Sequence, residues 1–405
     1  MVPRRRSKRG QEAELVTAFG VPARQLTFAE RLDTLARRAE ANDPRQPAIA
    51  LFWITLALIS LGFLLQVSHA ATTLPLAEFH GEVRSLLKMR LGGMLLLLGA
   101  MWIGPRGIRR LVPLLTLGIV LALVAVYVPG LQSSINGSRR WVAVPLLGGS
   151  FQPSEMARVI GVLWVAQRCY KLGPDVQDGR RGYLPMLVFG LLLFALILGE
   201  PDLGGAMLFF LCYGSTMWVG GARPAHVGIS MAGGLALAMV VGFRAFGYVR
   251  ERIAVWLGDS VNDQVTRAAE AMASGDVWGV GLAQGGFRNQ NLQYMQTDYA
   301  FSLVGEELGL SGMLLVIGLL LAFVWFAFRL VISLPDRYSA LVAFGLLVSV
   351  AFQGMLHLQV VTGLAPPKGM NLPFLSDGGT ALAASCLAVG LALGAARSPA
   401  EPNSV

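Results

Sequence analysis

Three carboxylates stand beside the start of a long apolar run in the last third of the chain. The stretch QTDYAFSLVGEELG (296–309) holds Asp298, Glu306 and Glu307, and the run LSGMLLVIGLLLAFVWFAF follows it. Carboxylates can exchange protons with a substrate hydroxyl, which is general acid–base chemistry. Glu306 and Glu307 also have a simpler interpretation, because acidic residues stabilise the positive N-terminus of a helix.

A second charged group begins another apolar stretch, FQPSEMARVIGVLW (151–164). Glu155 and Arg158 are three residues apart, so on a helix they share one face and can form an ion pair. A charged residue deep in a bilayer costs about 2.5–3.5 kcal/mol, and such residues usually face a cavity or a partner. We therefore favour a pair that lines an internal cleft over an interfacial salt bridge that only begins the helix.

Charged residues also occur in the connections between apolar stretches. In LQSSINGSRRWVAVP, Arg139 and Arg140 suit phosphate through their planar guanidinium forks, but they equally suit an interfacial anchor beside the tryptophan. In EPDLG, Glu200 and Asp202 either serve a site or cap the helix that follows. The residues alone leave both alternatives open.

The last connection, VTGLAPPKGMNLPFLSDGG (361–379), is rich in proline and glycine. Lys368 is its single cation, and Asp377 precedes a Gly-Gly helix start. Non-helical backbone at membrane depth is tolerated only where it is buried in protein or lines a cavity. We therefore expect this segment to roof a cavity.

The elements that must position these groups are membrane helices. Of the 405 residues, 54% are hydrophobic and 14% are charged, whereas soluble domains carry about a quarter charged residues. Apolar stretches of about 17 to 25 residues match helices that cross a hydrocarbon core of about 30 Å. The predicted fold class is therefore an all-α polytopic membrane protein.

The three scattered cysteines imply no disulfide framework, and the four dispersed histidines have no metal-ligand spacing.

Ten spans are predicted, roughly at 47–66, 88–104, 111–129, 153–170, 183–199, 204–220, 226–244, 305–329, 337–357 and 378–396. Basic residues concentrate in the N-terminal tail and in alternate connections, so the positive-inside rule places both termini in the cytoplasm. The chain then divides into a basic tail (1–46), a membrane domain (47–396) and a short tail (397–405). The net charge of +9 thus reflects the basic residues that mark the cytoplasmic side of the membrane. It indicates no nucleic-acid partner, and the tail is suited to membrane lipid headgroups.

One outward connection, at 245–304, is unusually long. Connections of this length are usually functional or disordered. This one contains an amphipathic stretch, YVRERIAVWLGD, a plausible short helix, DQVTRAAEAMASG, and a glycine-rich segment, WGVGLAQGGFRN. We expect it to form a folded layer at the outer membrane surface.

Six motifs, in this order, resemble the SEDS family of bacterial envelope proteins, which includes FtsW, RodA and SpoVE. They are NGSRRW (136–141), FQPSEMAR (151–158), EPDLG (200–204), GVGLAQ (279–284), TDY with GEELG (297–309) and PPKGMNLPFLSDGG (366–379). Each motif is weak alone, but six in sequence are specific. The PPKGMNLPF stretch is most similar to the division-type FtsW branch.

The resemblance implies a peptidoglycan glycosyltransferase that polymerises lipid II on the outer face of the bacterial cytoplasmic membrane, at the division septum. It places the family's essential aspartate at Asp298, which we expect to act as general base in an inverting displacement. It places the family's cavity pair at Glu155 and Arg158. The other residues of the predicted substrate site are Arg139, Arg140, Arg252, Arg288, Lys368 and Ser376. A divalent cation, Mg or Mn, is the expected cofactor beside the pyrophosphate, with no organic cofactor.

Several positions depart from the family pattern. Residues 293–296 read Gln-Tyr-Met-Gln in place of Pro-Glu-x-His, residues 376–379 read Ser-Asp-Gly-Gly in place of Ser-Tyr-Gly-Gly, and Arg158 replaces a lysine. The expected partners are a class B penicillin-binding transpeptidase and other divisome membrane proteins. A lipid II flippase and a non-catalytic division scaffold are alternatives, but the outward clustering of Asp298, Arg139 and Lys368 favours catalysis.

Overall fold

The computed structural model describes residues 43–397, except for 136–137, 145–148, 261 and 288–294. Helices dominate this part of the chain. The long ones are α3 (Arg45–Thr73), α4 (Leu76–Ile108), α5 (Val112–Ala125), α6 (Pro153–Leu172), α7 (Leu184–Gly199), α8 (Leu203–Val219), α9 (Pro224–Ala245), α12 (Ala300–Ser333), α13 (Arg337–Val361) and α14 (Gly379–Ala395). A helix lies over each of the ten ranges that the apolar pattern predicts.

Length and composition allow six of the described helices to cross a membrane. These are α3, α4, α7 with the turn before it, α9, α12 and α13. Three shorter described helices, α5, α8 and α14, are also apolar. Helices satisfy their own backbone hydrogen bonds, so they can enter lipid without unpaired polar groups. The chain is a polytopic, mainly helical membrane protein.

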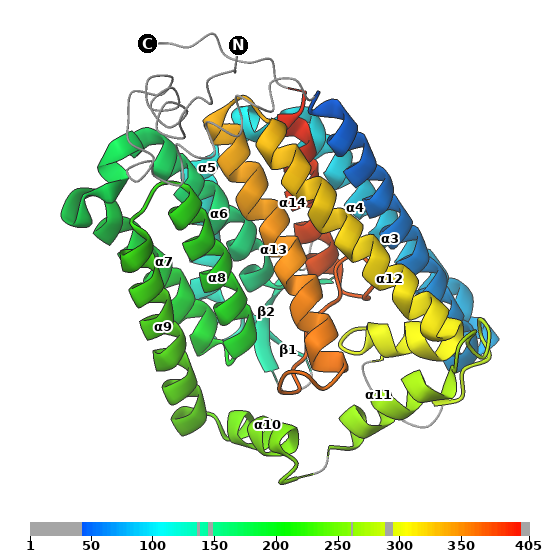
Figure 1. Cartoon of the computed structure of the whole chain (residues 1–405). Helices are drawn as coiled ribbons and strands as arrows, with labels where there is room; N and C mark the ends of the chain where they lie inside the picture. The colour runs from blue at the N-terminus through cyan, green and yellow to red at the C-terminus, as the bar shows by residue number, and fades with distance from the viewer. Residues whose placement is uncertain (1–42, 136–137, 145–148, 261, 288–294, 398–405) are drawn as a thin grey trace, which may run out of the picture.

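The helices stand side by side in one bundle, in which α4 packs along α14 (Figure 1). α13 lies in the interior, where it contacts α6, α8, α12 and α14. Its buried side chains include Leu346, Leu347 and Val350, which are at most 1% exposed. This core fixes the ends of the surrounding helices, and the candidate site lies where several of those ends meet.

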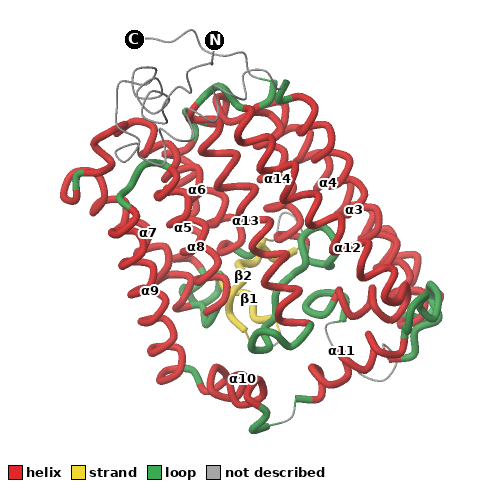
Figure 2. The backbone as a smooth tube through the Cα atoms, viewed as in Figure 1, coloured by secondary structure: helices red, strands yellow, loops and turns green. Residues whose placement is uncertain are grey.

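The beginning of α3 and the end of α14 lie at the same end of the bundle, and α10 (Gly247–Leu257) and α11 (Asp263–Ser274) lie at the opposite end (Figures 1 and 2). α11 lies over the short helix predicted within the long connection, and α10 lies over its amphipathic stretch. α11 begins after Asn262, whose side chain accepts hydrogen bonds from the N–H groups of Gln264 and Val265. Asparagine is a favoured residue at this position because it satisfies otherwise unpaired helix amides.

A small antiparallel sheet, which the sequence analysis did not predict, precedes α6. Its strands are β1 (Gln132–Ile135), β2 (Ser138–Val144) and β3 (Gly149–Phe151), in the order β1-β2-β3. Val142 of β2 lies opposite Gln132 on one side and Phe151 on the other. The Asn-Gly dipeptide at 136–137 is a strong sequence signal for a hairpin. Strand β2 places Arg140 beside the corner where α7 ends and α8 begins.

The helix α12 is interrupted at Gly309, where φ is 65°. Glycine adopts this left-handed conformation without the steric cost of a side chain. The next two amides then point away from the helix, and those of Leu310 and Ser311 donate to the carbonyls of Asp276 and Val277 at 2.8 Å and 3.0 Å. The kink thus ties the segment after α11 to α12.

Candidate functional site

Asp298 lies in the turn that leads into α12, two residues before Ala300, the first residue of that helix. Its partly exposed carboxylate packs against the backbone of Gly369, in the segment between α13 and α14. A Cβ on Gly369 would lie 2.6 Å from a carboxylate oxygen of Asp298, so a larger residue would displace the acid. The fold therefore brings two of the family-like motifs into direct contact.

The backbone beside Asp298 is held by Ser376. The Ser376 hydroxyl donates to the carbonyl of Thr297 at 2.6 Å and accepts from the N–H of Leu372 at 2.8 Å. Ser376 itself is only 3% exposed. The structure thus assigns Ser376 a positioning contact next to the acid, whereas the resemblance implied a substrate contact.

Two buried polar side chains that the sequence analysis did not single out hold the same region. Gln66 of α3 donates to the carbonyls of Gln296 and Leu375 at 2.9 Å and 3.1 Å. Arg90 of α4 donates to the carbonyls of residues 374–376 at 3.2 to 3.4 Å. Gln66 lies within a mainly apolar helix, and Arg90 is buried where the charged first half of α4 gives way to its apolar second half. A buried polar residue at such a place is itself a signal of a functional or structural partner.

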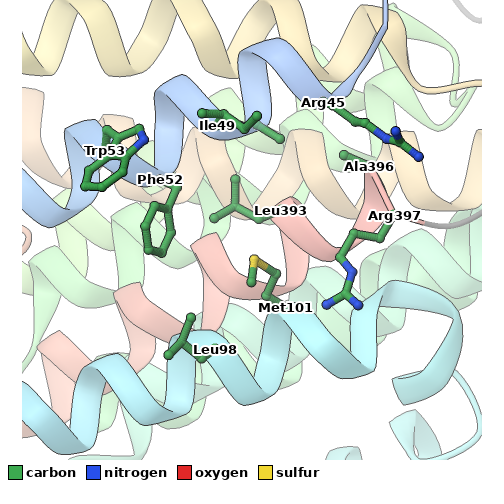
Figure 3. A pocket seen from close by; sticks show the side chains of 10 residues that line it. Arg45, Ile49, Phe52, Trp53, Leu98, Met101, Leu393, Ala396 and Arg397 are labelled. Atoms are coloured by element: carbon green, nitrogen blue, oxygen red, sulfur yellow. The ribbon is translucent and has the colours of Figure 1, made fainter.

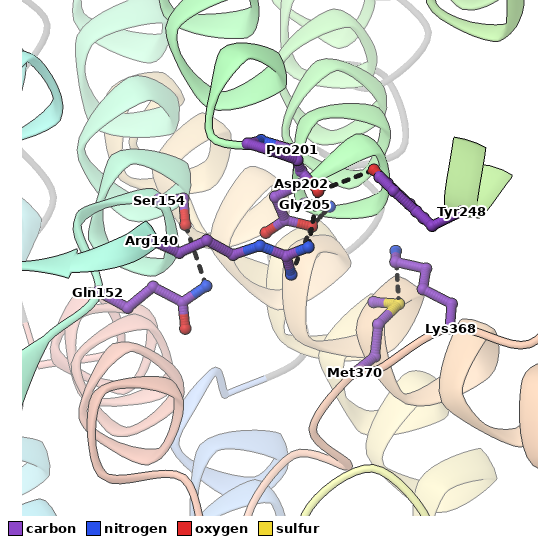
Figure 4. Close-up of polar contacts among 9 residues, drawn as sticks. All are labelled: Arg140, Gln152, Ser154, Pro201, Asp202, Gly205, Tyr248, Lys368 and Met370. Atoms are coloured by element: carbon purple, nitrogen blue, oxygen red, sulfur yellow. Dashed lines mark hydrogen bonds and ion pairs between the residues drawn. The ribbon is translucent and has the colours of Figure 1, made fainter. Parts of the chain in front are cut away.

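Arg140 reaches from β2 to the corner between α7 and α8 (Figure 4). Its guanidinium donates to the carbonyl of Pro201 at 2.6 Å and pairs with the carboxylate of Asp202 at 3.7 Å. Tyr248 of α10 donates to the same carbonyl at 2.8 Å. Asp202 also accepts from the N–H of Gly205 at 2.9 Å, which confirms the helix-capping interpretation of this carboxylate.

Lys368 extends toward the same corner from the segment between α13 and α14 (Figure 4). Its Nζ is 2.8 Å from Sδ of Met370, and it lies against Gly204 in the first turn of α8. A thioether is only a weak acceptor. Within the described residues, no carboxylate lies at ion-pair distance from Lys368. The ammonium group can therefore accept an anionic ligand.

Burial shifts the pKa values of both Asp298 and Lys368 toward neutral pH. Burial raises the pKa of Asp298 to about 6, while the neighbouring Arg252 and Arg140 guanidiniums oppose the shift. Burial lowers the pKa of Lys368 to about 8, while the Asp202 carboxylate opposes that shift. At pH 7, Asp298 is mostly anionic and Lys368 mostly cationic. Asp298 is thus a stronger base than an ordinary carboxylate, yet still ionised.

The second carboxylate of the α7–α8 corner behaves differently from Asp202. Glu200 is 1% exposed, and burial together with the Asp202 charge raises its pKa to about 9. Glu200 is therefore protonated at pH 7. The negative charge that faces Arg140 at this corner belongs to Asp202.

The predicted ion pair of α6 is confirmed. The Arg158 guanidinium lies 3.1 Å from a carboxylate oxygen of Glu155, and Arg158 is 3% exposed. The Glu155 charge acts on Lys368, where it favours the ammonium form. The pair therefore lies within electrostatic range of the Lys368 ammonium.

Of the remaining predicted cations, the structure describes the side chain of Arg252 but not those of Arg139 and Arg288. Arg252 lies on α10, with its guanidinium carbon 5.0 Å from the ring centroid of Tyr248. Arg139 belongs to β2, but its side chain is outside the described residues. Arg288 also lies outside the described residues. The structure therefore places Arg140 and Arg252 within electrostatic range of Asp298, and Lys368 within range of the same two guanidiniums and of Asp202.

Glu306 and Glu307 do not stand at a helix N-terminus, because α12 begins at Ala300 and not near 305. They are 0% and 1% exposed. Glu306 accepts from the N–H of Phe287 at 2.9 Å, and Glu307 accepts from the hydroxyl of Ser68 at 2.7 Å. The interpretation through the helix dipole is therefore wrong, and these carboxylates connect α12 to the preceding segment and to α3.

The described residues do not fit a dedicated metal site. No group of three or more histidine, cysteine, aspartate or glutamate side chains is placed among them to hold an ion. Around Asp298 and Asp202 lie three cations, Arg140, Arg252 and Lys368, which would oppose a bound metal. The expected divalent ion stays a prediction.

Comparisons with known proteins agree with these motifs and this fold. Residues 49–400 match the FtsW/RodA/SpoVE family model, described as cell cycle proteins. The probable peptidoglycan glycosyltransferase FtsW of Aromatoleum aromaticum is 30% identical over 89% of this chain and 90% of its own length. Stage V sporulation protein E of Bacillus subtilis is 33% identical over 68% of this chain and 76% of its own length.

Solved structures show the same fold. A chain from a peptidoglycan synthase complex, studied for its coordination of polymerisation and crosslinking, is 26% identical with a TM-score of 0.67, over 86% of this chain and 96% of that chain. The rod shape determining protein RodA of Thermus thermophilus is 23% identical with a TM-score of 0.61, over 86% of this chain and 95% of that chain. The chain belongs to the FtsW/RodA/SpoVE family, known as SEDS, and is of the FtsW type.

Proposed function

We propose that this chain is a septal peptidoglycan glycosyltransferase that joins lipid II disaccharides into glycan strands on the outer face of the cytoplasmic membrane. The activity is the one named for its FtsW relatives. One observation carries the proposal within this chain. Asp298, mostly ionised at pH 7, stands at the start of an apolar helix within electrostatic range of Arg140 and Arg252, and the same two guanidiniums act on Lys368 at the α7–α8 corner.

The reaction needs both a base and an anion site. The 4-hydroxyl oxygen of the acceptor sugar forms a bond to the anomeric carbon of the donor, and the bond from that carbon to the pyrophosphate breaks with inversion. The hydroxyl proton passes to Asp298, and the lipid pyrophosphate leaves with the electron pair. Positioned general bases typically contribute about 10²–10⁴-fold to a rate.

The leaving group explains the cations. Negative charge develops on the pyrophosphate as the glycosidic bond breaks, and fixed cations aimed at this position stabilise the transition state. Lys368 supplies an ammonium that has no carboxylate at ion-pair distance among the described residues. Arg140 and Arg252 supply guanidiniums, and the Glu155–Arg158 pair adds polar groups on the side of α6.

The location of the base follows from the substrate. A polyprenyl tail must stay in lipid while the sugars stay in water, so the reacting atoms lie at the membrane surface. In the proposed topology, ten helices cross the membrane, both termini are cytoplasmic, and α10 and α11 form part of an outward layer. Asp298 is then at the outer surface, at the start of α12.

Transport of lipid II across the membrane is the rival function. A transporter places its essential charged groups near the middle of the bilayer. In this chain the charged cluster around Asp298 instead involves helix ends and connections: β2, the α7–α8 corner, α10 and the segment before α14. This placement favours catalysis.

The proposed partner is a class B penicillin-binding transpeptidase at the division septum. The similarity to a chain from a peptidoglycan synthase complex supports a partnership of this kind.

The test of the proposed activity is a polymerisation assay with purified protein, labelled lipid II and the transpeptidase, with and without EDTA. Polymer formation supports the proposed activity, and loss of polymer with EDTA supports the predicted divalent ion. Absence of polymer under every condition contradicts the proposed activity.

A further inference from the structure

A cavity of about 380 Å³ lies far from Asp298, at the end of the bundle where α3 begins and α14 ends (Figure 3). It is lined by the first turns of α3, the second half of α4 and the end of α14. The lining residues are Arg45, Ala48, Ile49, Phe52, Trp53, Leu98, Met101, Leu393, Ala396 and Arg397. None of them takes part in the site around Asp298.

The walls of this cavity are apolar and run into the membrane. The α3 lining follows a helical stripe from Arg45 through Ile49 to Trp53, a rise of about 12 Å at 1.5 Å per residue. Ile49 and Trp53 are 57% and 60% exposed, and Leu98 of α4 is 39% exposed. Apolar side chains this exposed on a membrane helix face lipid. The cavity is therefore a groove open to the hydrocarbon.

Two guanidiniums stand at one end of this groove. Arg45 and Arg397 are both exposed, and Figure 3 shows them at the same end, with Trp53 and Leu98 at the other. In the described part of the chain, neither has a carboxylate at ion-pair distance. The two arginines therefore present positive charge at the end of an apolar groove.

Helix electrostatics explains one of these arginines but not the other. Arg397 follows the end of α14, where a cation is favoured by the helix dipole. Arg45 is the first residue of α3, where the Asp43 carboxylate accepts from the Arg45 N–H at 3.0 Å and so already supplies the negative charge that a helix start favours. An anion between the two guanidiniums would instead offset the positive charge of the two side chains.

We propose that this groove binds one anionic glycerophospholipid of the cytoplasmic leaflet. Its phosphate lies between Arg45 and Arg397, and an acyl chain lies along Ile49, Trp53 and Leu98. Guanidinium forks match phosphate oxygens, and basic pockets between helices on the cytoplasmic side bind anionic headgroups. A soluble phosphate would leave the apolar walls uncovered. A zwitterionic lipid would bring its own ammonium group next to the arginines. The proposal does not depend on the catalytic activity.

The test uses the full-length chain, purified in detergent and stripped of lipid. Binding of dioleoyl phosphatidylglycerol and of dioleoyl phosphatidylcholine is measured by native mass spectrometry. We expect the wild-type chain to bind phosphatidylglycerol at least about tenfold more tightly. The double variant Arg45→Gln/Arg397→Gln should lose about tenfold or more of this affinity, since each arginine near a charged surface contributes on the order of a fourfold to sixfold factor.

Two further variants separate the groove from general surface charge. Arg180→Gln removes an exposed arginine from the turn between α6 and α7, on the predicted cytoplasmic side, and should bind like the wild type. Leu98→Trp fills the groove and should weaken phosphatidylglycerol binding with both guanidiniums intact. Thermal unfolding of each variant verifies its fold.

Three outcomes would overturn the proposal. The first is unchanged phosphatidylglycerol binding in the double arginine variant. The second is an equal loss in Arg180→Gln, which would indicate that charge acts from anywhere on this face. The third is displacement of phosphatidylglycerol from the wild type by equimolar polyprenyl phosphate, which would assign the groove to a different lipid.

Discussion

The hydroxyl of Ser376 donates a hydrogen bond to the carbonyl of Thr297 at 2.6 Å, and so joins the segment between α13 and α14 to the residue before Asp298. The same hydroxyl accepts from the N–H of Leu372. The acid is thus held by a segment that also carries Gly369, its packing partner, and Lys368. Catalysis in this account depends on that segment staying in place.

Replacing Ser376 with alanine should therefore slow polymerisation without unfolding the protein. The substitution leaves the Thr297 carbonyl and the Leu372 N–H without their partner, and an unsatisfied buried polar group costs about 1–3 kcal/mol. We expect a decrease in kcat of about tenfold, measured as the initial rate of polymer formation. Ser311→Ala removes an exposed hydroxyl from α12 and should leave the rate unchanged. Equal rates for the two variants would contradict the positioning contact.

The rate of polymerisation should have a bell-shaped dependence on pH. The pKa of Asp298 is raised to about 6, and the base must be ionised, so kcat/KM should fall as the pH drops below about 6. The pKa of Lys368 is lowered to about 8, and its cation must be present, so kcat/KM should also fall above about 8. Lys368→Arg should remove the alkaline limb, because arginine stays charged. Lys171→Arg is the matched control. An unchanged alkaline limb in Lys368→Arg would exclude Lys368 as its origin.

Removal of the Arg252 charge should shift the acidic limb upward. The Arg252 guanidinium opposes the rise in the pKa of Asp298, so Arg252→Gln should raise that pKa further. Polymerisation at pH 6.5 should then decrease more than at pH 7.5. Arg250→Gln changes an exposed arginine on the same helix and provides the control. A uniform loss at both pH values would indicate that Arg252 does not act on the base.

Arg90 should matter for stability as well as for activity. Arg90→Met removes the Arg90 donor from the carbonyls of Phe374 and Ser376, and leaves the Leu375 carbonyl with Gln66 alone. We expect a loss of about 2–4 kcal/mol in the free energy of unfolding, measured as a decrease in Tm. Lys88→Met, at an exposed position of the same helix, should have little effect. Comparable Tm values for the two variants would show that the Arg90 contacts contribute nothing.

The helical architecture could be predicted because its signal is local. Apolar runs of membrane-spanning length mark the helices, and the three-residue spacing of Glu155 and Arg158 identified an ion pair that the structure has at 3.1 Å. The amphipathic stretch at α10 and the helical pattern at α11 are also local signals. Each of these predictions needs only the residues of one element.

The contacts that assemble the site could not be predicted in this way. Gln66 and Arg90 act on carbonyls hundreds of positions away in the chain, and no spacing rule connects them. The boundary of α12 was set too late, which misplaced Glu306 and Glu307 at a helix start. The small sheet was missed, although the Asn-Gly dipeptide before β2 indicated a hairpin.

The most direct measurement is polymer formation from labelled lipid II by the Asp298→Ala variant, with the transpeptidase present and with proof that the variant folds and inserts. Loss of the base should reduce the initial rate by at least about 10²-fold, while the thermal unfolding profile stays close to that of the wild type. A folded, membrane-inserted Asp298→Ala variant that polymerises at the wild-type rate would contradict the assignment of Asp298 as the general base.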